Sequence, residues 1–567
     1  MKDKYLYTHD PIVKKIFLAM LAPTILMNLT TAIGSMADTV IIGHYLDDAS
    51  LSVVTFATPI YMVINALAAL FAVGGCIAMS IDSGKGDKAT ANKSFSISVE
   101  MIVLSGTLLL LAGIFLMDPI THWLGAEEDI FESVKIYARI ILIGAPIFAL
   151  NISLAFFVRN DGRPTLSMIG MFTSIIVDII LNVGFVGALH MGVAGAAYST
   201  VIGQLVSAAV IGSHFFTAKN TLRFRLTFDS TVLRIIKNGG SSALHFVYQF
   251  VTILILNHFL STLAGTNGVV IYTVVFNLST VSLSVFEGIS QTIQPMVSTY
   301  YGEKSYTHIR ETMRLAFTTV FIVCGLVTVI LEVIPQIVPT VFGIDDAVLI
   351  EQSSQAVRIY AAGMIITTVN VVLGYYLQST EQNFTAAVMI SLRSLVLFLF
   401  FTILLGKFFG MNGVWAAYTA AEVVSFIVCI IMLRIKQRKL GAGETKVDIM
   451  LLDEEIKAAQ VCLICNCTSD NAEHYRKKVI EVIKEELCLD STLAYNTESY
   501  LLALEGHCAS TKKGRFIATE MNGKSETIII RDNLEHCNLK ESIDSIINNA
   551  TESKYGPVLG WNRICLK

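Results

Sequence analysis

Long apolar stretches separated by short polar segments occupy most of the chain between Pro11 and Leu433. A stretch of about 20 apolar residues is long enough to cross a bilayer as a helix. The pattern predicts twelve such helices, and the even number places both ends of the membrane part on one side. The predicted spans are residues 12–36, 48–76, 94–117, 136–158, 165–187, 191–216, 239–262, 268–297, 314–338, 356–378, 384–406 and 411–434.

Several short motifs recur in the second half of this pattern in the same order. Such a duplication predicts two six-helix lobes of the same orientation, related by an axis along the membrane normal and with a cavity between them. We assign residues 1–216 to the first lobe, 217–237 to a cytoplasmic linker and 238–434 to the second lobe. The recurring motifs include Gly43-His-Tyr-Leu46 with Asn257-His-Phe-Leu260, Ile136-Tyr-Ala138 with Ile359-Tyr-Ala361, and the segment 190–198 with 410–418.

The pattern changes after Leu433, where a basic segment is followed by a charged, mixed sequence. We expect a linker at 435–450 and a small cytoplasmic α+β domain, with a regulatory role, at 451–567. Its predicted strands are Val461–Asn466, Phe516–Met521 and Ser525–Arg531, the last two joined by the turn signal Asn522-Gly523. Its predicted helices are Ala472–Leu487 and Thr497–Ser510. We interpret Cys462, Cys465 and Cys467 as strand cysteines rather than half of a zinc site, because no second cysteine pair follows.

Composition agrees with a membrane protein that carries a soluble appendage. Of the 567 residues, 54% are hydrophobic and 15% charged, and the mean hydropathy is +0.63. Soluble domains carry about 25% charged residues. The net charge of −4 gives no reason to expect a nucleic-acid partner.

Lys and Arg residues determine the predicted orientation. Loops on one side of the predicted bundle carry only Lys135, Arg358 and Lys407, whereas loops on the other side carry many more. Cytoplasmic loops are enriched in these residues. We therefore expect both termini in the cytoplasm and the protein in the inner (plasma) membrane.

Ionisable residues inside the predicted spans are the candidate functional groups. A carboxylate at bilayer depth costs roughly 2.5–3.5 kcal/mol on insertion scales, and such residues usually mark ion or substrate pathways. Asp38 and Asp178 are our main candidates. Asp178 and Asn182 share one helix face because they are four residues apart. The other acids considered are Glu287 and Glu422.

Carboxylate, amide and hydroxyl oxygens together favour a hard cation such as Na⁺, or a proton carried by the same groups. We therefore predict an ion-coupling site of Asp38, Asp178, Asn182, Thr200 and Asn151, with Asp38, Asp178 and Asn182 as the ligands of a metal ion. The alternative is that these residues join helices through ordinary hydrogen bonds. The Gly- and Ala-rich stretches, including Gly74-Gly75, are expected to serve close helix packing.

At these residues the membrane part resembles the multidrug and toxic compound extrusion (MATE) transporters over about residues 10–435. The resemblance rests on Ala22-Pro23, Ala37-Asp38 to Gly43-His44, Gly86-Asp87, Arg159-Asn-Asp-Gly162, Gly195-Ala-Ala197, Gln294-Pro295 and Tyr301-Gly302-Glu303. It implies a bacterial exporter of organic cations or other amphipathic compounds, driven by entry of Na⁺ or H⁺. It also implies that helix 1 bends near Pro23 during transport. The order Asp178 then Asn182 is the reverse of the family pattern.

The C-terminal part is similar to the histidine-kinase-like ATP-binding fold of anti-sigma-factor kinases. Asp532 resembles the nucleotide-binding aspartate, and Gly556 and Gly560 resemble the late glycine box. The Asn that binds Mg²⁺ in that family is not evident between Glu505 and Ser510. The resemblance therefore implies a degenerate domain that senses or binds rather than phosphorylates.

The function we predict is secondary active efflux by alternating access, with Pro23, Glu287 and Glu422 as substrate or gating residues. We expect no enzymatic activity, no cofactor for transport, a monomer in the bilayer, and a cytoplasmic regulatory partner for the C-terminal domain. One alternative is a lipid-linked saccharide flippase of similar architecture, which would need a cationic centre. Another is a membrane-anchored signalling protein that acts through its C-terminal domain.

Overall fold

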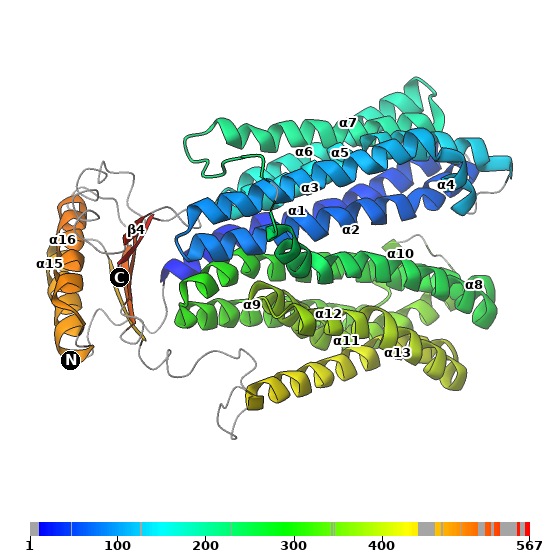
Figure 1. Ribbon diagram of the computed structural model, residues 1–567. Helices are drawn as coiled ribbons and strands as arrows, with labels where there is room; N and C mark the ends of the chain where they lie inside the picture. Colours follow the sequence, from blue (N-terminus) through cyan, green and yellow to red (C-terminus); the bar gives the residue numbers. More distant parts are fainter. Residues whose placement is uncertain are drawn as a thin grey trace.

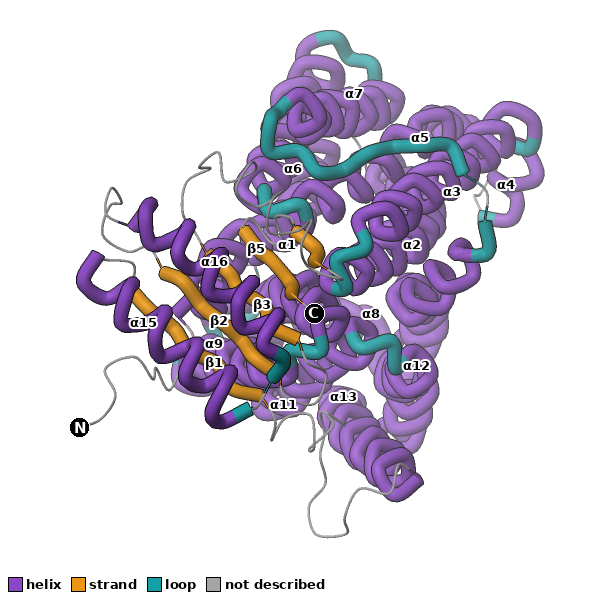
Figure 2. The backbone as a smooth tube through the Cα atoms, turned by 60° about the vertical axis from the view of Figure 1, so that its left-hand side comes forward, coloured by secondary structure: helices purple, strands orange, loops and turns teal. Residues whose placement is uncertain are grey.

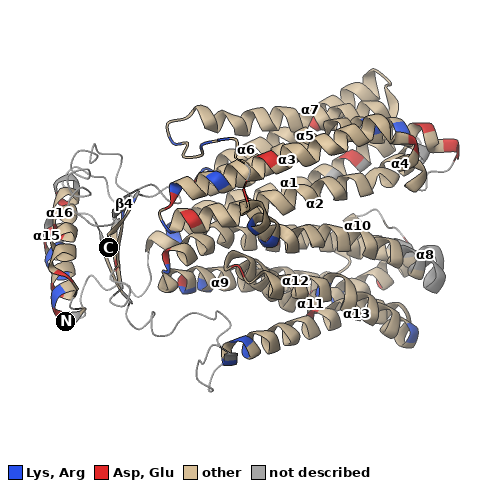
Figure 3. Ribbon diagram, in the orientation of Figure 1, with Lys and Arg blue, Asp and Glu red and all other residues tan. Residues whose placement is uncertain are grey.

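The apolar stretches form long helices that lie side by side in a bundle, and a small sheet domain covers one end of it (Figure 1). We call this end the domain end and the opposite end the distal end. The computed structural model describes residues 11–46, 48–124, 128–227, 229–341, 344, 346–439, 460–466, 469–487, 489–508, 516–522, 527–532, 553–555 and 562–566. Charged residues are sparse along the middle of the bundle and more frequent toward its ends (Figure 3).

The first lobe consists of six long helices and one short one. Asp87 caps the third long helix, since its carboxylate accepts a 3.0 Å hydrogen bond from the Thr90 backbone N–H. A π-helical segment, Val183–Ala188, follows the fifth long helix directly. The helices are α1 (Pro11–Tyr45), α2 (Asp48–Gly84), α3 (Lys88–Phe115), α4 (Met117–Trp123), α5 (Phe131–Asn160), α6 (Pro164–Asn182) and α7 (Gly192–Gly212).

The second lobe repeats this arrangement with longer continuous helices. Its first helix, α8, supplies two membrane-length segments, Thr231–Leu256 and Ile271–Glu303. A second π-helical segment, Leu392–Val396, again lies in the fifth span of its lobe. The helices are α8 (Thr231–Glu303), α9 (Tyr306–Val333), α10 (Ile337–Val341), α11 (Ala347–Ser379), α12 (Asn383–Ser391) and α13 (Leu397–Lys439).

Within the described residues, 11 helical segments are long and apolar enough to cross a membrane. The last of them, Asn383–Arg438, has 56 residues and would extend for about 84 Å as one helix. A hydrocarbon core is only about 30 Å thick. Gly410 interrupts this segment with non-helical backbone (φ 59°, ψ −143°). We therefore count it as two crossings, which agrees with the twelve predicted spans.

Backbone conformation supports the internal repeat independently of sequence similarity. Residues with positive φ stand at corresponding helix boundaries or helix breaks in the two lobes, and the members of each pair are separated by nearly the same length of chain. Lys304 and Glu381 adopt this conformation although it disfavours side chains other than Gly. The pairs are Gly86 with Lys304, Gly162 with Glu381, and Gly192 with Gly410.

The two lobes meet where α2 packs against α8, and glycines allow the backbones to touch. A Cβ atom on Gly239 would lie 1.8 Å from the Leu70 carbonyl oxygen, and one on Gly74 would lie 2.1 Å from the Ile235 carbonyl oxygen. No side chain could be accommodated at such distances. The packing role predicted for Gly74 is thus confirmed, and it operates between the lobes.

The C-terminal domain has the predicted α+β composition. All neighbouring strands of its sheet are antiparallel, in the order β1-β2-β3-β5-β4. The helices α15 (Ser469–Glu481) and α16 (Ser491–Cys508), with the π-helical segment Val482–Glu486 between them, cover the face away from the bundle (Figure 2). The strands are β1 (Gln460–Asn466), β2 (Phe516–Asn522), β3 (Thr527–Asp532), β4 (Ser553–Tyr555) and β5 (Asn562–Leu566).

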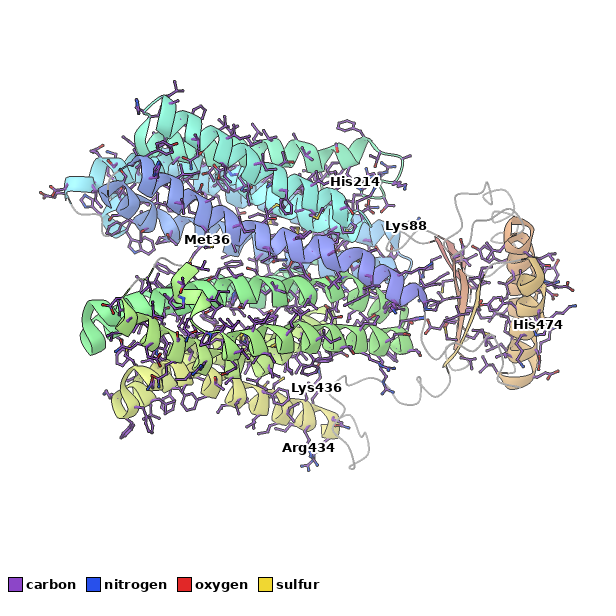
Figure 4. All side chains as sticks on the ribbon, turned by 180° about the vertical axis from the view of Figure 1, so that it is seen from behind. Met36, Lys88, His214, Arg434, Lys436 and His474 are labelled. Carbon is purple, nitrogen blue, oxygen red and sulfur yellow. The ribbon has the colours of Figure 1, made fainter. Side chains whose placement is uncertain are left out.

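Successive side chains along the strands point to opposite faces of the sheet, and both faces are buried. Leu463, Ile517 and Ile530 belong to the core shared with α15 and α16. Their neighbours Ile464 and Ala518 point to the other face and join an apolar cluster formed by the helices of the bundle. The sheet therefore lies between its own helices and the membrane part, as the side-chain view shows (Figure 4).

Candidate functional site

The centre of the candidate site is a contact between α1 and α6. Asp38 lies in the last third of α1, toward the distal end, and is half-buried. The Asn182 side-chain amide donates a 3.2 Å hydrogen bond to Asp38 Oδ1. Gly34, one turn earlier in α1, allows this approach, because a Cβ atom there would lie 3.0 Å from Ile175 of α6.

Asp178 completes the group, which we call the acid cluster (Asp38, Asp178 and Asn182). Its carboxyl interacts directly with Asp38 and faces the hydroxyl groups of Ser199 and Thr200 on α7. The residue is 6% exposed, and within the described part of the chain its Oδ1 has no hydrogen-bond partner. Two adjacent acids with an unfilled acceptor can hold a proton or a hard cation.

Local sequence explains why these groups converge. Asp178 and Asn182 are one helical turn apart on α6, as predicted. The π-helical segment begins directly after Asn182, and such segments often occur at functional sites. Gly203 brings α7 against α6, since a Cβ atom there would lie 2.7 Å from the Ser174 carbonyl oxygen and 3.3 Å from Asp178 Cβ.

Two tyrosines near the acid cluster were not identified from the sequence. The Tyr61 hydroxyl of α2 and the Tyr137 hydroxyl of α5 are 3.1 Å apart, and both interact electrostatically with Asp38 and Asp178. Tyr137 belongs to the repeated Ile136-Tyr-Ala138 motif, which was the available signal. Tyr61 stands in an ordinary apolar run without such a signal.

Asn151 occupies a different position from the one predicted. Its amide donates a 2.6 Å hydrogen bond to Gln204 Oε1 and lies 3.9 Å from the Met171 sulfur. These contacts join Asn151 to α6 and α7 through Met171 and Gln204 rather than to the aspartates. Thr200 faces Asp178, while its hydroxyl donates to the Ala196 carbonyl oxygen at 2.9 Å.

The equivalent spans of the second lobe contain an ion pair. Arg393, in the second π-helical segment, lies 2.7 Å from Glu422 Oε1, and Asn370 donates a 2.6 Å hydrogen bond to Glu422 Oε2. Glu422 is 2% exposed. Glu422, which we predicted as a substrate or gating residue, is therefore held in a buried ion pair. Glu287 is separate and lies 3.9 Å from His245.

Arg159 directly follows the predicted span 136–158, but in the structure it lies inside α5. Its side chain is completely buried near the domain end of α5. It donates a 3.1 Å hydrogen bond to Gln291 of the second lobe and lies 4.6 Å over the Phe156 ring. A long basic side chain at a helix end resembles a loop residue in sequence, although here it turns inward.

Pro23 lies inside the continuous helix α1. Proline removes one helical hydrogen bond, so the preceding turn is weakened. Just beyond it α1 contacts the other lobe, because Asn28 and Gln291 exchange hydrogen bonds of 3.2 and 3.1 Å. The same helix therefore contacts the second lobe through Asn28 and the acid cluster through Asp38.

The nucleotide site predicted in the C-terminal domain stays a prediction. Asp532 is buried at the end of β3. Gly556 and Gly560 lie outside the described residues. In the part of the chain that the structure describes, no three His, Cys, Asp or Glu side chains gather as a metal-binding group. Cys462 instead lies 3.9 Å from His308 of α9.

A polytopic helical bundle with a repeated lobe and buried acids defines the class of membrane transporters. Residues 23–184 and 241–404 match the MatE family, and the chain belongs to that family. It is a transporter rather than an enzyme.

Relatives and solved structures agree with this assignment. The chain is 23% identical over 446 residues to "Multidrug export protein MepA" of Staphylococcus saprophyticus, a match that covers 77% of this chain and 98% of the relative. It shares its fold with an outward-facing multidrug resistance MATE family transporter of the MOP superfamily (TM-score 0.71, 22% identity, 76% and 97% of the two chains). A MATE structure described as being in the bent conformation matches with a TM-score of 0.70 (22% identity, 76% and 96%).

Proposed function

We propose that this protein is a secondary active efflux transporter that exports organic cations or other amphipathic compounds in exchange for Na⁺ or H⁺. The observation that carries the proposal is the acid cluster, in which Asn182 holds Asp38 beside Asp178. Two adjacent carboxylates repel each other when both are ionised. Entry of a proton or Na⁺ relieves this repulsion and draws α1 toward α6.

Coupling requires that ion binding at the acid cluster changes the contacts between the two lobes. Helix α1 connects the two places. The helix binds the ion through Asp38 and contacts the second lobe through Asn28 and Gln291. A shift or bend of α1 near Pro23 would therefore alter the interlobe contact. The ion must favour one conformation over the other for this shift to move substrate.

The first lobe is the coupling lobe in this proposal, because Glu422, the acid in the equivalent spans of the second lobe, is neutralised by Arg393. Glu422 is held by Arg393 and Asn370, so its expected substrate or gating role depends on breaking a buried ion pair. Among the described residues, Glu287 forms no bidentate ion pair of this kind, and we propose it as the second-lobe acid that faces substrate. A cation as substrate would be attracted by its carboxylate.

The Lys and Arg bias supports a cytoplasmic domain end and a multi-pass protein of the inner membrane with both termini inside. Substrate would then enter from the domain end and leave at the distal end. The relatives reported above are described as multidrug export or multidrug resistance transporters, which supports amphipathic compounds as the substrate class. We keep the monomer, the absence of a required cofactor and the cytoplasmic regulatory partner as predictions.

Transport into vesicles with imposed gradients tests the proposal. Purified protein would be reconstituted with a fluorescent organic cation, and Na⁺ and pH gradients would be imposed separately. We expect export with only one of the two gradients, and loss of that gradient dependence in Asp38→Asn. Export that ignores both gradients, or that persists in Asp38→Asn, would remove the antiport assignment.

A further inference from the structure

We propose that the C-terminal domain is an interlobe clamp, docked across the cytoplasmic ends of both lobes and holding them together. The clamp must leave before the cytoplasmic side can open. This inference rests on the alternating access of the proposed function. It assigns a conformational role to a part of the chain that the family match, which ends at residue 404, does not include.

The sheet presents a continuous docking face to the bundle, formed by alternate residues of four strands. Ile464 and Ala518 of this face belong to the apolar cluster of the bundle, which also contains Ile12 and Tyr300. The polar members are also buried, with Glu520 at 3% and Arg563 at 4% exposure. The docking face comprises Cys462, Ile464, Ala518, Glu520, Ile529, Arg531, Arg563 and Cys565.

A buried polar network fixes the docking face on the second lobe. Ser305 donates a hydrogen bond to Glu520 Oε2 at 2.6 Å, and His308 Nδ1 lies 3.0 Å from the same carboxylate. Arg531 pairs with Glu520 at 3.3 Å and also with Glu303 at the end of α8. The Glu303 side chain is completely buried by these contacts.

Arg563 extends the contact to the first lobe. Its Nε lies 2.8 Å from Glu303 Oε1 of α8, while its NH2 group donates a 2.6 Å hydrogen bond to the carbonyl oxygen of Gly84 at the end of α2. One guanidinium therefore binds both lobes at once. If the lobes separate at this end, Arg563 must release one of its two partners.

The clamp covers the region in which the lobes are already closed. A Cβ atom on Gly84 would lie 2.1 Å from the Thr299 carbonyl oxygen, so α2 and α8 are in backbone contact there. Arg234 of α8 binds Asp82 of α2 at 2.8 Å and Glu381 at 2.7 Å. The domain thus stabilises the closed cytoplasmic side and would lose contacts to an open one.

The C-terminal domain therefore binds the closed conformation more tightly than the open one. Docking can control transport for this reason. A partner that binds one conformation more tightly shifts the population toward it, and the coupling acts in both directions. Opening the cytoplasmic side with the domain in place would leave buried charges unpaired, which is strongly unfavourable. Release of the domain is therefore the step at which transport can be regulated.

Distances between the lobes test the clamp without any transport assay. Spin labels would be attached through Lys88→Cys on the first lobe and Arg434→Cys on the second, with other reactive cysteines replaced by Ser. Both positions are exposed at the domain end (Figure 4). We expect Arg563→Ala to lengthen the distance and Arg563→Lys to do so less.

Arg476→Ala provides the matched control, because Arg476 pairs with Glu498 and Glu505 on the opposite side of the same domain. It should leave the distance unchanged. An unchanged distribution in Arg563→Ala would overturn the clamp, as would an equal change in both variants. This outcome is independent of which ion or substrate the protein uses.

A reversible cross-link tests whether the domain must leave. Cys462 lies 3.9 Å from the His308 ring, so His308→Cys would place two thiols across the docking interface. We expect the oxidised variant, with its link confirmed by mass spectrometry, to lose transport at least tenfold, and reduction to restore it. His308→Ser, which cannot form the link, should be insensitive to oxidant.

Full transport by the cross-linked protein would show that the domain stays docked throughout the cycle and would overturn the proposal. A reduced protein that exports nothing under either gradient would instead count against the proposed transport function. In that case the interlobe distances still decide for or against the clamp. The two ideas can therefore fail separately.

Discussion

The side-chain amide of Asn182 donates a hydrogen bond to the Asp38 carboxylate across the contact between α6 and α1. The two residues are far apart in sequence, and each comes from a different helix of the same lobe. Their contact makes Asp38 a positioned group rather than an isolated acid facing lipid. It follows that Asn182 should raise the ion affinity of the proposed site, although the site should still bind the ion without it.

Asp38→Asn should abolish ion-coupled export, because the amide can neither take up a proton nor neutralise Na⁺. The measurement is gradient-driven transport in vesicles, together with membrane expression. Asp118→Asn is the control, since Asp118 is an exposed acid of the same lobe that binds Lys135 at the distal end. Normal coupling in Asp38→Asn would contradict the assignment.

Asn182→Ala should weaken ion affinity and leave the maximal rate largely intact. A hydrogen bond to a charged group contributes about 1.5–3 kcal/mol, which corresponds to roughly a tenfold or greater rise in the ion concentration for half-maximal transport. An ion titration of the transport rate measures this. A fall in the maximal rate at unchanged ion affinity would show that Asn182 acts elsewhere.

Gly203→Ala should destabilise the first lobe by about 1–3 kcal/mol, the usual cost of overpacking. The added Cβ would lie 2.7 Å from the Ser174 carbonyl oxygen. Gly212→Ala, at the end of the same helix, meets nothing within 4 Å and is the control. Thermal unfolding in detergent compares the two, and equal melting temperatures would contradict the packing argument.

Glu422→Gln should destabilise the second lobe strongly, because removing one partner of a buried ion pair costs about 3–5 kcal/mol. The double variant Arg393→Met with Glu422→Leu should recover much of that loss, since no charge is then left unpaired. Thermal unfolding of the single and double variants measures the difference. A double variant no more stable than Glu422→Gln would show that the pair is not the main stabilising contact.

The contribution of the Glu520 carboxylate to docking of the C-terminal domain should be constant between pH 8 and pH 5. Burial alone would raise the pKa of this carboxyl, but His308, Arg531 and Ser305 hold it at about 2, below the usual 4.5. A lowered pKa stabilises docking above pH 4.5, and this contribution is lost as the pH falls toward 2. Interlobe distances at several pH values measure it, and lengthening between pH 8 and pH 5 would contradict it.

Much of the architecture was predictable because a bilayer imposes long apolar runs, and each predicted span coincides with a helical segment in the structure. The acids of the site were also visible, since Asp38 and Asp178 interrupt such runs. The i, i+4 spacing placed Asn182 correctly beside Asp178. These inferences needed only periodicity and the cost of burying charge.

The partners of these groups were not predictable, because they depend on how each helix is rotated about its axis. Asn151 contacts Gln204 instead of the aspartates, and Arg393 neutralises Glu422. Arg159 turns inward from a helix end that resembled a loop. A single sequence records none of these rotations.

The docking face was missed for a related reason. Glu520, Arg531 and Arg563 are charged strand residues, and charged side chains are rarely buried unless they are paired. Their buried partners on α2, α8 and α9 come from distant parts of the chain. Only the three-dimensional arrangement shows that this polar face is covered.

A sheet that is covered on both sides has a practical consequence for work with fragments. When the C-terminal domain is produced without the helical bundle, the apolar side chains of Ile464 and Ala518 become exposed next to unpaired arginines and a glutamate. Such a fragment should be prone to self-association, and ligand titrations on it would report an artificial surface. A reporter protein fused after β5 would sit beside Arg563 and disturb the very contact under study, so an N-terminal fusion is the better choice.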